Sequence, residues 1–369
     1  MKKADIVIIG AGIVGLAIAT AVSKKGRTVI VVEKENSFGQ GASSRNSEII
    51  HSGIYYRQGS LKADLCIKGK NLIYSFCREQ NIPFRKTGKL IVATDDSESE
   101  EIDGLFENGK ANGVGDLRLL DKKEIKKIEP EVSGDSAIYS PSTGIVDTHQ
   151  LMKRLQYLAE NKGAVFAYGC EVRAIDKKPG LYNILVRDTD GEDLTLTTPI
   201  AINSAGIYSD TIASMAGIDI DKSGYRIHYS KGEYFKVTNK KAKLLNSLIY
   251  PAPKSTSLGI HTVIDLQGEV KLGPSARYAD SIDYNVDPTH RDEFYESTKT
   301  FLPFLNKEDL APDTAGIRAK IQREGEPEKD FVIKEESDKG LPGMINLIGI
   351  ESPGFTSSLA IAKYVENML

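Results

Sequence analysis

The sequence predicts an α/β (α+β) fold in which a domain with a parallel sheet is interrupted by a second domain built on a mixed or antiparallel sheet. Three apolar, β-branched runs end in glycine or small-residue turns that open helices, near residues 10, 206 and 354. Residues 225–300 instead alternate polar and apolar over short runs, at 233–237, 258–264 and 269–272. The length of 369 residues also favours two domains.

The chain opens with a strand, a glycine loop, a helix and a second strand. Ile6–Ile9 is fully apolar, as expected of a strand buried on both faces. Residues 10–15 read Gly-Ala-Gly-Ile-Val-Gly, and helical spacing then continues to Lys24-Lys25-Gly26, a basic and glycine stop signal. A second apolar strand over 28–32 closes at Glu33. This order is typical of a Rossmann-like dinucleotide-binding unit.

Each part of this unit has a chemical reason. Gly10 permits the tight turn, Gly12 lets the backbone approach a pyrophosphate, and Gly15 lets the helix and strand pack closely. The helix N-terminus offers N–H groups to the phosphates. Glu33 follows Gly15 by 18 residues and can accept hydrogen bonds from a ribose hydroxyl, which disfavours a 2′-phosphate.

The same segment has an alternative interpretation as a targeting signal. Residues 6–23 carry no charge and follow Lys2 and Lys3, as in a secretory signal processed after Ala19 or a short membrane segment. A signal would not continue into a second buried strand that ends in an acid. We therefore expect a buried nucleotide-binding element and no transmembrane segment.

A second loop, over residues 39–47, combines glycines and hydroxyls with Arg45. Ser43, Ser44 and Arg45 are suited to phosphate contacts, and the alternative is a surface loop with a solvated arginine.

The remaining elements follow from periodicity. We expect helices over 61–80, 97–112 and 148–161, strands over 88–93 and 164–167, a hairpin over 184–197, a strand over 199–206 with a helix after it, and a strand over 344–350 with a helix from 351–358 to the end. We expect the first domain to comprise 1–82, 144–218 and 312–369, and the second 83–143 and 219–311.

Composition excludes several partners. The net charge of −3 predicts no nucleic-acid partner. Three cysteines without a metal-ligand spacing predict no metal site and favour a cytoplasmic location, with peripheral contact at the inner face of a membrane as the alternative.

The chain resembles the D-amino-acid-oxidase-like FAD-dependent oxidoreductases, and among them the L-2-hydroxyglutarate dehydrogenases and oxidases. The resemblance covers essentially the whole chain, in order. It is carried by NSEIIHSGIYY (46–56), SLKADLC (60–66), GKLIVA (88–93), TGIVD (143–147), AGIYSD (205–210), LIYPAP (248–253), LGIH (258–261), AGIRA (315–319) and TSSLAIA (356–362). Residues 262–268 and 351–354 depart from the 2-hydroxyglutarate enzymes, which leaves another 2-hydroxy acid open as substrate.

This resemblance implies FAD as cofactor and a set of residues that bind it. Gly10, Gly12 and Gly15 would contact the pyrophosphate, Glu33 with Lys34 the adenosine ribose, and Ser43, Ser44 and Arg45 the phosphates or ribityl chain. Val172 would contact adenine, Gly206 would close over the dinucleotide, and Gly354, Thr356, Ser357 and Ser358 would face the flavin.

The resemblance also implies oxidation of a small 2-hydroxy acid, with L-2-hydroxyglutarate to 2-oxoglutarate as the leading reaction. Arg318 is the expected carboxylate clamp and Lys231 a candidate for a second carboxylate. His51 and His261 are the candidate bases, Tyr55 and Tyr250 would orient the substrate, and a covalent flavin link through His51 is the minor alternative.

The alternative functions are an amino-acid or amine oxidase, a glycerol-3-phosphate-type dehydrogenase and a non-redox exported binding protein. The electron acceptor is left open between oxygen, a quinone and a redox protein.

Overall fold

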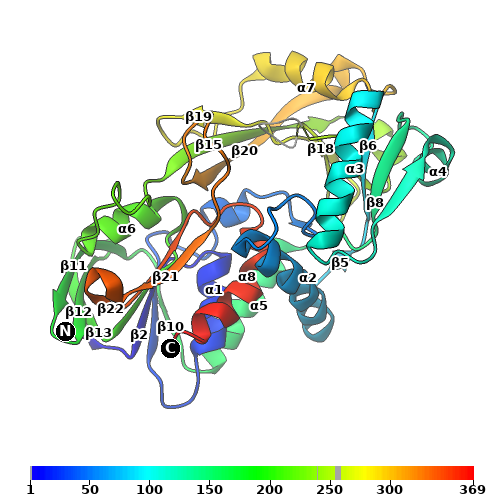
Figure 1. Ribbon diagram of the computed structural model, residues 1–369. Helices are drawn as coiled ribbons and strands as arrows, with labels where there is room; N and C mark the ends of the chain where they lie inside the picture. Colours follow the sequence, from blue (N-terminus) through cyan, green and yellow to red (C-terminus); the bar gives the residue numbers. More distant parts are fainter. Residues whose placement is uncertain (1, 239, 254–258) are drawn as a thin grey trace. The chain divides into compact units, whose positions relative to one another are not determined.

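A computed structural model describes residues 2–238, 240–253 and 259–369 (Figure 1). The chain forms two compact units. The first comprises Met1–Ser44, Thr148–Tyr229 and Arg318–Leu369, and the second comprises Arg45–Asp147 and Ser230–Ile317.

The first unit is built on a six-stranded sheet with the strand order β10-β3-β2-β14-β22-β21. The first five strands pair in parallel and β21 pairs antiparallel with β22. The strands are β2 (Ile6–Ile9), β3 (Val29–Val32), β10 (Val165–Ala167), β14 (Ile200–Asn203), β21 (Val332–Glu336) and β22 (Leu341–Ile348). The predicted parallel sheet is thus confirmed, and the three predicted strand–turn–helix junctions share it.

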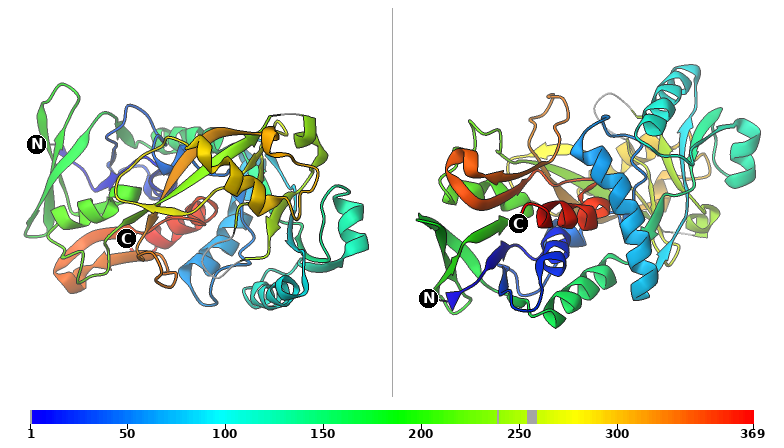
Figure 2. Two further views of the ribbon diagram at one scale, coloured as in Figure 1. Left: turned by 90° about the horizontal axis from the view of Figure 1, so that it is seen from above. Right: turned by 60° about the horizontal axis from the view of Figure 1, so that its bottom comes forward.

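Helices and a second sheet cover this sheet. Helix α1 (Ile13–Val22) contacts α5 (Thr148–Asn161) and α8 (Gly354–Glu366), and the three lie side by side (Figures 1 and 2). A four-stranded sheet contacts β2 and β14 through two of its strands, in the order β1 (Lys2–Lys3), β13 (Asp193–Thr198), β12 (Leu181–Arg187) and β11 (Glu171–Lys178). Helix α6 (Ser209–Met215) follows β14 through the short turn η2 (Gly206–Tyr208).

The second unit contains three sheets. A five-stranded sheet joins β15 (His228–Val237), which begins two residues before this unit, β17 (Thr262–Ile264), β18 (Val270–Leu272), β19 (Arg277–Ala279) and β20 (Leu310–Lys320). A four-stranded sheet has the order β16 (Leu248–Pro251), β6 (Lys89–Ala93), β8 (Ser136–Ser140) and β7 (Arg118–Asp121). A small sheet joins β4 (Ile49–Ile50), β9 (Gly144–Val146) and β5 (Phe84–Arg85). The helices are α2 (Leu61–Gln80), α3 (Asp96–Ala111), α4 (Lys122–Ile128) and α7 (Arg291–Thr298).

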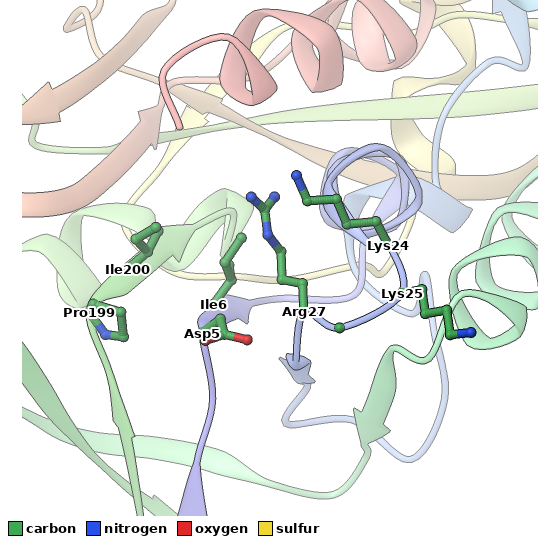
Figure 3. A pocket seen from close by; sticks show the side chains of 8 residues that line it. Asp5, Ile6, Lys24, Lys25, Arg27, Pro199 and Ile200 are labelled. Atoms are coloured by element: carbon green, nitrogen blue, oxygen red, sulfur yellow. The ribbon is translucent and has the colours of Figure 1, made fainter.

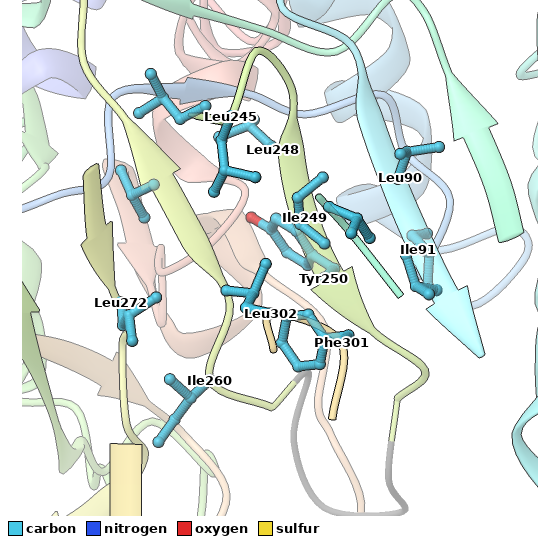
Figure 4. Close-up of a cluster of buried hydrophobic side chains, with 14 of the residues drawn as sticks. Leu90, Ile91, Leu245, Leu248, Ile249, Tyr250, Ile260, Leu272, Phe301 and Leu302 are labelled. Atoms are coloured by element: carbon cyan, nitrogen blue, oxygen red, sulfur yellow. The ribbon is translucent and has the colours of Figure 1, made fainter. Parts of the chain in front are cut away.

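Apolar side chains from these sheets form the core of the second unit. Leu90 and Ile91 of β6, Tyr250 of β16 and Phe301 are all buried in one cluster (Figure 4). Capping residues define the helix starts, since the side chain of Ser60 accepts from the Ala63 N–H at the start of α2 and that of Asp95 from the Glu98 N–H at the start of α3.

Two expectations about organisation differ from the structure. Residues 45–82 lie in the second unit, because β4 pairs with β9 and the Tyr74 hydroxyl donates to the Ser142 carbonyl. Residues 144–147 and 312–317 also lie in the second unit, and 219–229 in the first.

Residues 225–300 do not form one antiparallel sheet. Strands β15, β17 and β18 pair antiparallel as expected, but β16 pairs in parallel with β6, and residues 291–298 are helical. The β16 run of Leu-Ile-Tyr-Pro carries no signal for the partner it finds, because strand pairing across 150 residues is a tertiary choice. Leu258, where one predicted run begins, lies outside the described residues.

Candidate functional site

The glycine loop of the first unit joins β2 to α1 at the carboxyl end of the parallel strands. Gly10 has φ +102°, and a Cβ there would lie 2.7 Å from the Ser204 carbonyl oxygen. A Cβ on Gly15 would lie 2.0 Å from the Gly10 carbonyl oxygen, which no side chain tolerates. The structure therefore requires Gly10 for the turn and Gly15 for close packing, as the sequence predicts.

Gly12, the third residue of this loop, leaves space beside the backbone where a side chain would otherwise lie. A Cβ there would meet only the Ser43 hydroxyl, at 3.1 Å. The Ser43 hydroxyl accepts a hydrogen bond of 3.0 Å from the Ile13 N–H in the first turn of α1. Ser43 thus lies at the N-terminus of α1, where a phosphate would bind, and the exposed Ser44 donates to the Gly41 carbonyl.

Glu33 lies beside the loop at the end of β3. Its carboxylate accepts hydrogen bonds from the Ala11 N–H at 2.7 Å and the Glu35 N–H at 3.0 Å. Its carbonyl accepts from the Cys170 N–H, which brings the segment leading to Val172 next to Glu33. Glu33 and Val172 are therefore held close together by β3 and the start of β11.

Lys34 and Gly206 complete this side of the loop. The Lys34 ammonium lies 3.8 Å from the centre of the Tyr208 ring and 3.6 Å from the Glu35 carboxylate. Burial opposes the charge of Lys34, but Tyr208 and Glu35 raise its pKa above the ordinary value. Gly206 has φ +58° and starts the η2 turn after β14.

The N-terminus of α8 presents buried hydroxyl groups. Thr356, Ser357 and Ser358 are fully buried, and the helix has no side-chain N-cap. The Ser357 and Ser358 hydroxyls have no hydrogen-bond partner among the described residues. Such orphaned hydroxyls are rare in a folded interior unless a ligand satisfies them. These hydroxyls, together with a glycine loop that leaves no room for side chains at Gly10 and Gly15, fit a bound dinucleotide.

The second unit gathers a cluster of titratable side chains. His51 follows β4, and Tyr250 stacks on His261 with ring centroids 3.7 Å apart. The Nδ1 of His261 lies 2.9 Å from the Gly259 carbonyl oxygen, so Nδ1 carries the proton in the neutral ring and Nε2 is the acceptor. Burial lowers the pKa of His51 to about 3, with the nearby charges of Lys89 and His261 adding to the effect. The structure thus brings both predicted histidines together.

Lys89 is the member of this cluster that the sequence prediction missed. It is 1% exposed, and its ammonium lies 4.5 Å from the Tyr55 ring centre and 4.6 Å from the Tyr250 ring centre. The two rings are 6.3 Å apart. Leu248 pairs with Lys89 in the register of β16 and β6, so the diagonal neighbour Tyr250 lies on the same face. The sequence did carry a signal for this residue, since Lys89 is a lysine within the otherwise apolar strand predicted over 88–93.

Three predicted residues have other surroundings. Lys231 forms ion pairs of 2.7 Å with Asp283 and 3.5 Å with Glu233, so its charge is already compensated. Arg45 belongs to the second unit, unlike Ser43 and Ser44, and its exposed guanidinium stacks 3.9 Å from the Tyr284 ring centre. Arg318 is half-buried on β20 and belongs to the first unit, whereas the histidine cluster belongs to the second.

A separate pocket lies at the opposite end of the parallel sheet. It is lined by residues that precede β2, β3 and β14, including Asp5, Arg27 and Pro199 (Figure 3). The glycine loop follows the carboxyl end of β2, so this pocket belongs to the other edge of the sheet and has no part in the dinucleotide site.

The described residues form neither a metal site nor a membrane-spanning helix. Over 2–238, 240–253 and 259–369, no group of three His, Cys, Asp or Glu side chains is arranged to hold a metal. Among the same residues, no helix has the length and apolar character needed to cross a bilayer.

Comparison with known proteins supports a dinucleotide-binding site in the first unit. Residues 5–368 match the FAD dependent oxidoreductase family. The chain is 38% identical to the mitochondrial L-2-hydroxyglutarate dehydrogenase of Arabidopsis thaliana, over 99% of this chain and 83% of that protein. It is 32% identical to the mitochondrial L-2-hydroxyglutarate dehydrogenase of Homo sapiens, over 98% of this chain and 87% of that protein.

Solved structures give the same answer for the fold. The dithionite-reduced L-α-glycerophosphate oxidase of Mycoplasma pneumoniae, with FAD bound, superposes with a TM-score of 0.87 at 26% identity, covering 100% of this chain and 95% of that one. Glycine oxidase of Geobacillus kaustophilus superposes with a TM-score of 0.83 at 20% identity, covering 100% and 95%. With a glycine loop and orphaned hydroxyls that fit a dinucleotide, and a family match over nearly its whole length, the chain belongs to the FAD dependent oxidoreductases.

Proposed function

We propose that this FAD-dependent oxidoreductase oxidises L-2-hydroxyglutarate to 2-oxoglutarate. The observation that carries the proposal is the 38% identity over 99% of the chain to a protein named for that activity. The histidine cluster supports it, because oxidation of a hydroxy acid needs a group that accepts the hydroxyl proton. FAD supplies the two-electron acceptor.

The first unit holds the cofactor in this proposal. Gly10, Gly12 and Gly15 would contact the pyrophosphate with Ser43 and Ser44, and Glu33 and Lys34 would contact the ribose. Val172, which is buried, would contact adenine, and Gly206, which starts the η2 turn, would close over the dinucleotide. Ser357 and Ser358, whose hydroxyls lack partners among the described residues, would face the flavin together with Gly354 and Thr356. Arg45 has the weakest support, because its guanidinium is stacked on Tyr284.

The substrate is held and deprotonated by side chains. Arg318 binds the carboxylate next to the hydroxyl, since guanidinium pairs with carboxylate in a bidentate fork. His51 accepts the hydroxyl proton in this proposal, because its ring lies in the cluster with Lys89 and His261. His261, whose Nδ1 faces the Gly259 carbonyl, is the alternative base. Tyr55 and Tyr250 orient the substrate.

Glycerol 3-phosphate is the second candidate substrate. The glycerophosphate oxidase matches the chain at 26% identity with a TM-score of 0.87, which favours this reaction over others on the fold. Glycine oxidase, at 20% identity, supports only the fold. The family match over residues 5–368 argues against a non-redox binding protein.

The cytoplasmic location predicted from the sequence belongs to the same proposal. It is supported by Cys66, Cys77 and Cys170, which are all free thiols. The relatives from Arabidopsis thaliana and Homo sapiens are named as mitochondrial proteins. Peripheral contact with a membrane would suit a quinone as electron acceptor.

Anaerobic reduction of the bound flavin tests the proposed function. The FAD-loaded protein is mixed without oxygen with L-2-hydroxyglutarate, its D-enantiomer, L-glycerol 3-phosphate or glycine, and flavin absorbance is followed. We expect rapid bleaching with L-2-hydroxyglutarate and none on the same timescale with the other three. Bleaching by L-glycerol 3-phosphate alone would transfer the assignment to that substrate, and an unchanged spectrum with all four would overturn both.

A further inference from the structure

Lys89 is a buried cation that has no carboxylate partner in the part of the chain that the structure describes. It is 1% exposed, and among the described residues the Cys66 thiol is the group that favours its charged form. Burial lowers the pKa of Lys89 to about 7. A buried ammonium is costly unless an anion or a set of hydrogen-bond acceptors compensates it. The aromatic faces of Tyr55 and Tyr250 supply part of that compensation.

Lys231 of the same unit has the usual surroundings of a largely buried lysine, in which carboxylates balance its charge. Its side chain is 14% exposed and has two carboxylate neighbours, Asp283 at 2.7 Å and Glu233 at 3.5 Å. Glu233 in turn contacts His290. The cation that the sequence offered for a second substrate carboxylate is therefore already neutralised, whereas Lys89 is not.

Two hydrogen-bond donors adjoin Lys89 and also lack partners. The hydroxyls of Tyr55 and Tyr250 are buried and have no hydrogen-bond partner in the described part of the chain. Tyr250 is 0% exposed. Figure 4 shows its ring among apolar side chains of the core, with the hydroxyl at one end as its polar atom. An ammonium and two phenols with unmet hydrogen-bonding capacity form a site complementary to an anion.

We propose that Lys89, with the hydroxyls of Tyr55 and Tyr250, binds the carboxylate of the substrate that is distant from the reacting hydroxyl. This inference rests on the proposed function, in which L-2-hydroxyglutarate is the substrate. It makes Lys89 a specificity residue that selects dicarboxylic over monocarboxylic 2-hydroxy acids. The bound carboxylate supplies the negative charge that none of the described residues places beside Lys89.

The experiment compares three ligands on the full FAD-loaded chain. L-2-hydroxyglutarate carries both carboxylates, L-2-hydroxyvalerate lacks the distant one, and glutarate lacks the hydroxyl and cannot be oxidised. Anaerobic flavin reduction gives affinity and rate for the first two, and calorimetry gives the affinity for glutarate. The variants are Lys89→Met, Lys89→Arg and Tyr250→Phe. Lys271→Met is the control, since Lys271 pairs with Asp313 at 2.6 Å.

We expect Lys89→Met to lose about tenfold or more in affinity for L-2-hydroxyglutarate and glutarate, as for a lost charged hydrogen bond. Its affinity for L-2-hydroxyvalerate, which lacks the distant carboxylate, changes little. Lys89→Arg recovers part of the loss, and Lys271→Met behaves as the wild type. Tyr250→Phe removes a hydroxyl without an internal partner, so it keeps the fold and loses a smaller part of the glutarate affinity.

Other outcomes overturn the inference. Equal losses for both hydroxy acids would place Lys89 at the shared end of the substrate or give it a purely structural role. Unchanged glutarate affinity in Lys89→Met, or in Tyr250→Phe if the lysine variant does not fold, would remove the anion site. If no 2-hydroxy acid reduces the wild-type flavin, the proposed function fails, and glutarate binding still decides the role of Lys89.

Discussion

The candidate site of the first unit is made mainly of backbone, and that of the second unit is made of side chains. Around the glycine loop, the space that Gly10 and Gly15 leave and the hydrogen bonds of Glu33 shape a surface for a dinucleotide. In the second unit, His51, Lys89, Tyr250 and His261 come from separate segments and meet through sheet pairing and ring stacking. A site made of backbone groups is encoded by the local sequence, whereas a site made of side chains depends on which distant segments pair.

The largest expected effect breaks the backbone site. Gly15→Val would place side-chain atoms 2.0 Å from the Gly10 carbonyl oxygen, so we expect loss of bound FAD and of all activity. Flavin absorbance per protein after purification measures this. Gly104→Ala is the matched control, because a Cβ there meets nothing within 4 Å and Gly104 lies in helix α3. Full FAD occupancy in Gly15→Val would contradict the role given to the loop.

The second prediction removes the proposed base while leaving the backbone site intact. His51→Asn is expected to keep bound FAD and to slow anaerobic flavin reduction by about 10²–10⁴-fold. The spectrum of bound FAD and the rate of bleaching by L-2-hydroxyglutarate separate the two effects. His228→Asn serves as control, because His228 begins β15 outside the cluster. A rate within about threefold of wild type would leave His261 as the base.

The smallest expected effect is on the stability of the protein. It concerns Lys89, a buried side chain of the second unit for which the backbone site of the first unit has no counterpart. The pKa of Lys89 falls from 10.5 to about 7 on folding, chiefly by burial. Between these values the unfolded chain holds a proton on Lys89 that the folded chain has released. The free energy of unfolding therefore rises with pH over that range, and below about pH 7 Lys89 adds no further pH dependence because both states hold its proton.

Chemical denaturation of wild type and Lys89→Met at pH 7 and pH 10 measures this contribution. We expect the stability of the wild type relative to Lys89→Met to increase by about 1 kcal/mol or more at the higher pH. The groups beside Lys89 are His51, Tyr55, Cys66 and Tyr250. The charge of Lys89 also lowers the pKa values of His51 and Cys66, so the comparison measures Lys89 together with these two neighbours. An unchanged difference would show that Lys89 stays charged in the fold.

Much of the first unit could be predicted because its signals are local. The apolar run of β2, the glycine spacing and the acid at Glu33 lie within 28 residues, and the structure retains their order. Less of the second unit could be predicted. Residues 45–82 join it because β4 pairs with β9 nearly 100 residues later, and β16 pairs with β6 across a still longer separation. No local pattern encodes such partners.

The sequence alone determined the strand–glycine–helix–strand unit and its dinucleotide chemistry, because these depend on residue type and short spacing. The two histidines were predicted only through the family resemblance. Only the tertiary structure decided that Lys231 is neutralised by Asp283 and that Lys89 is not. The charge state and availability of a lysine depend on which side chains surround it after burial. Those neighbours come from the pairing of distant strands, which composition and periodicity do not specify.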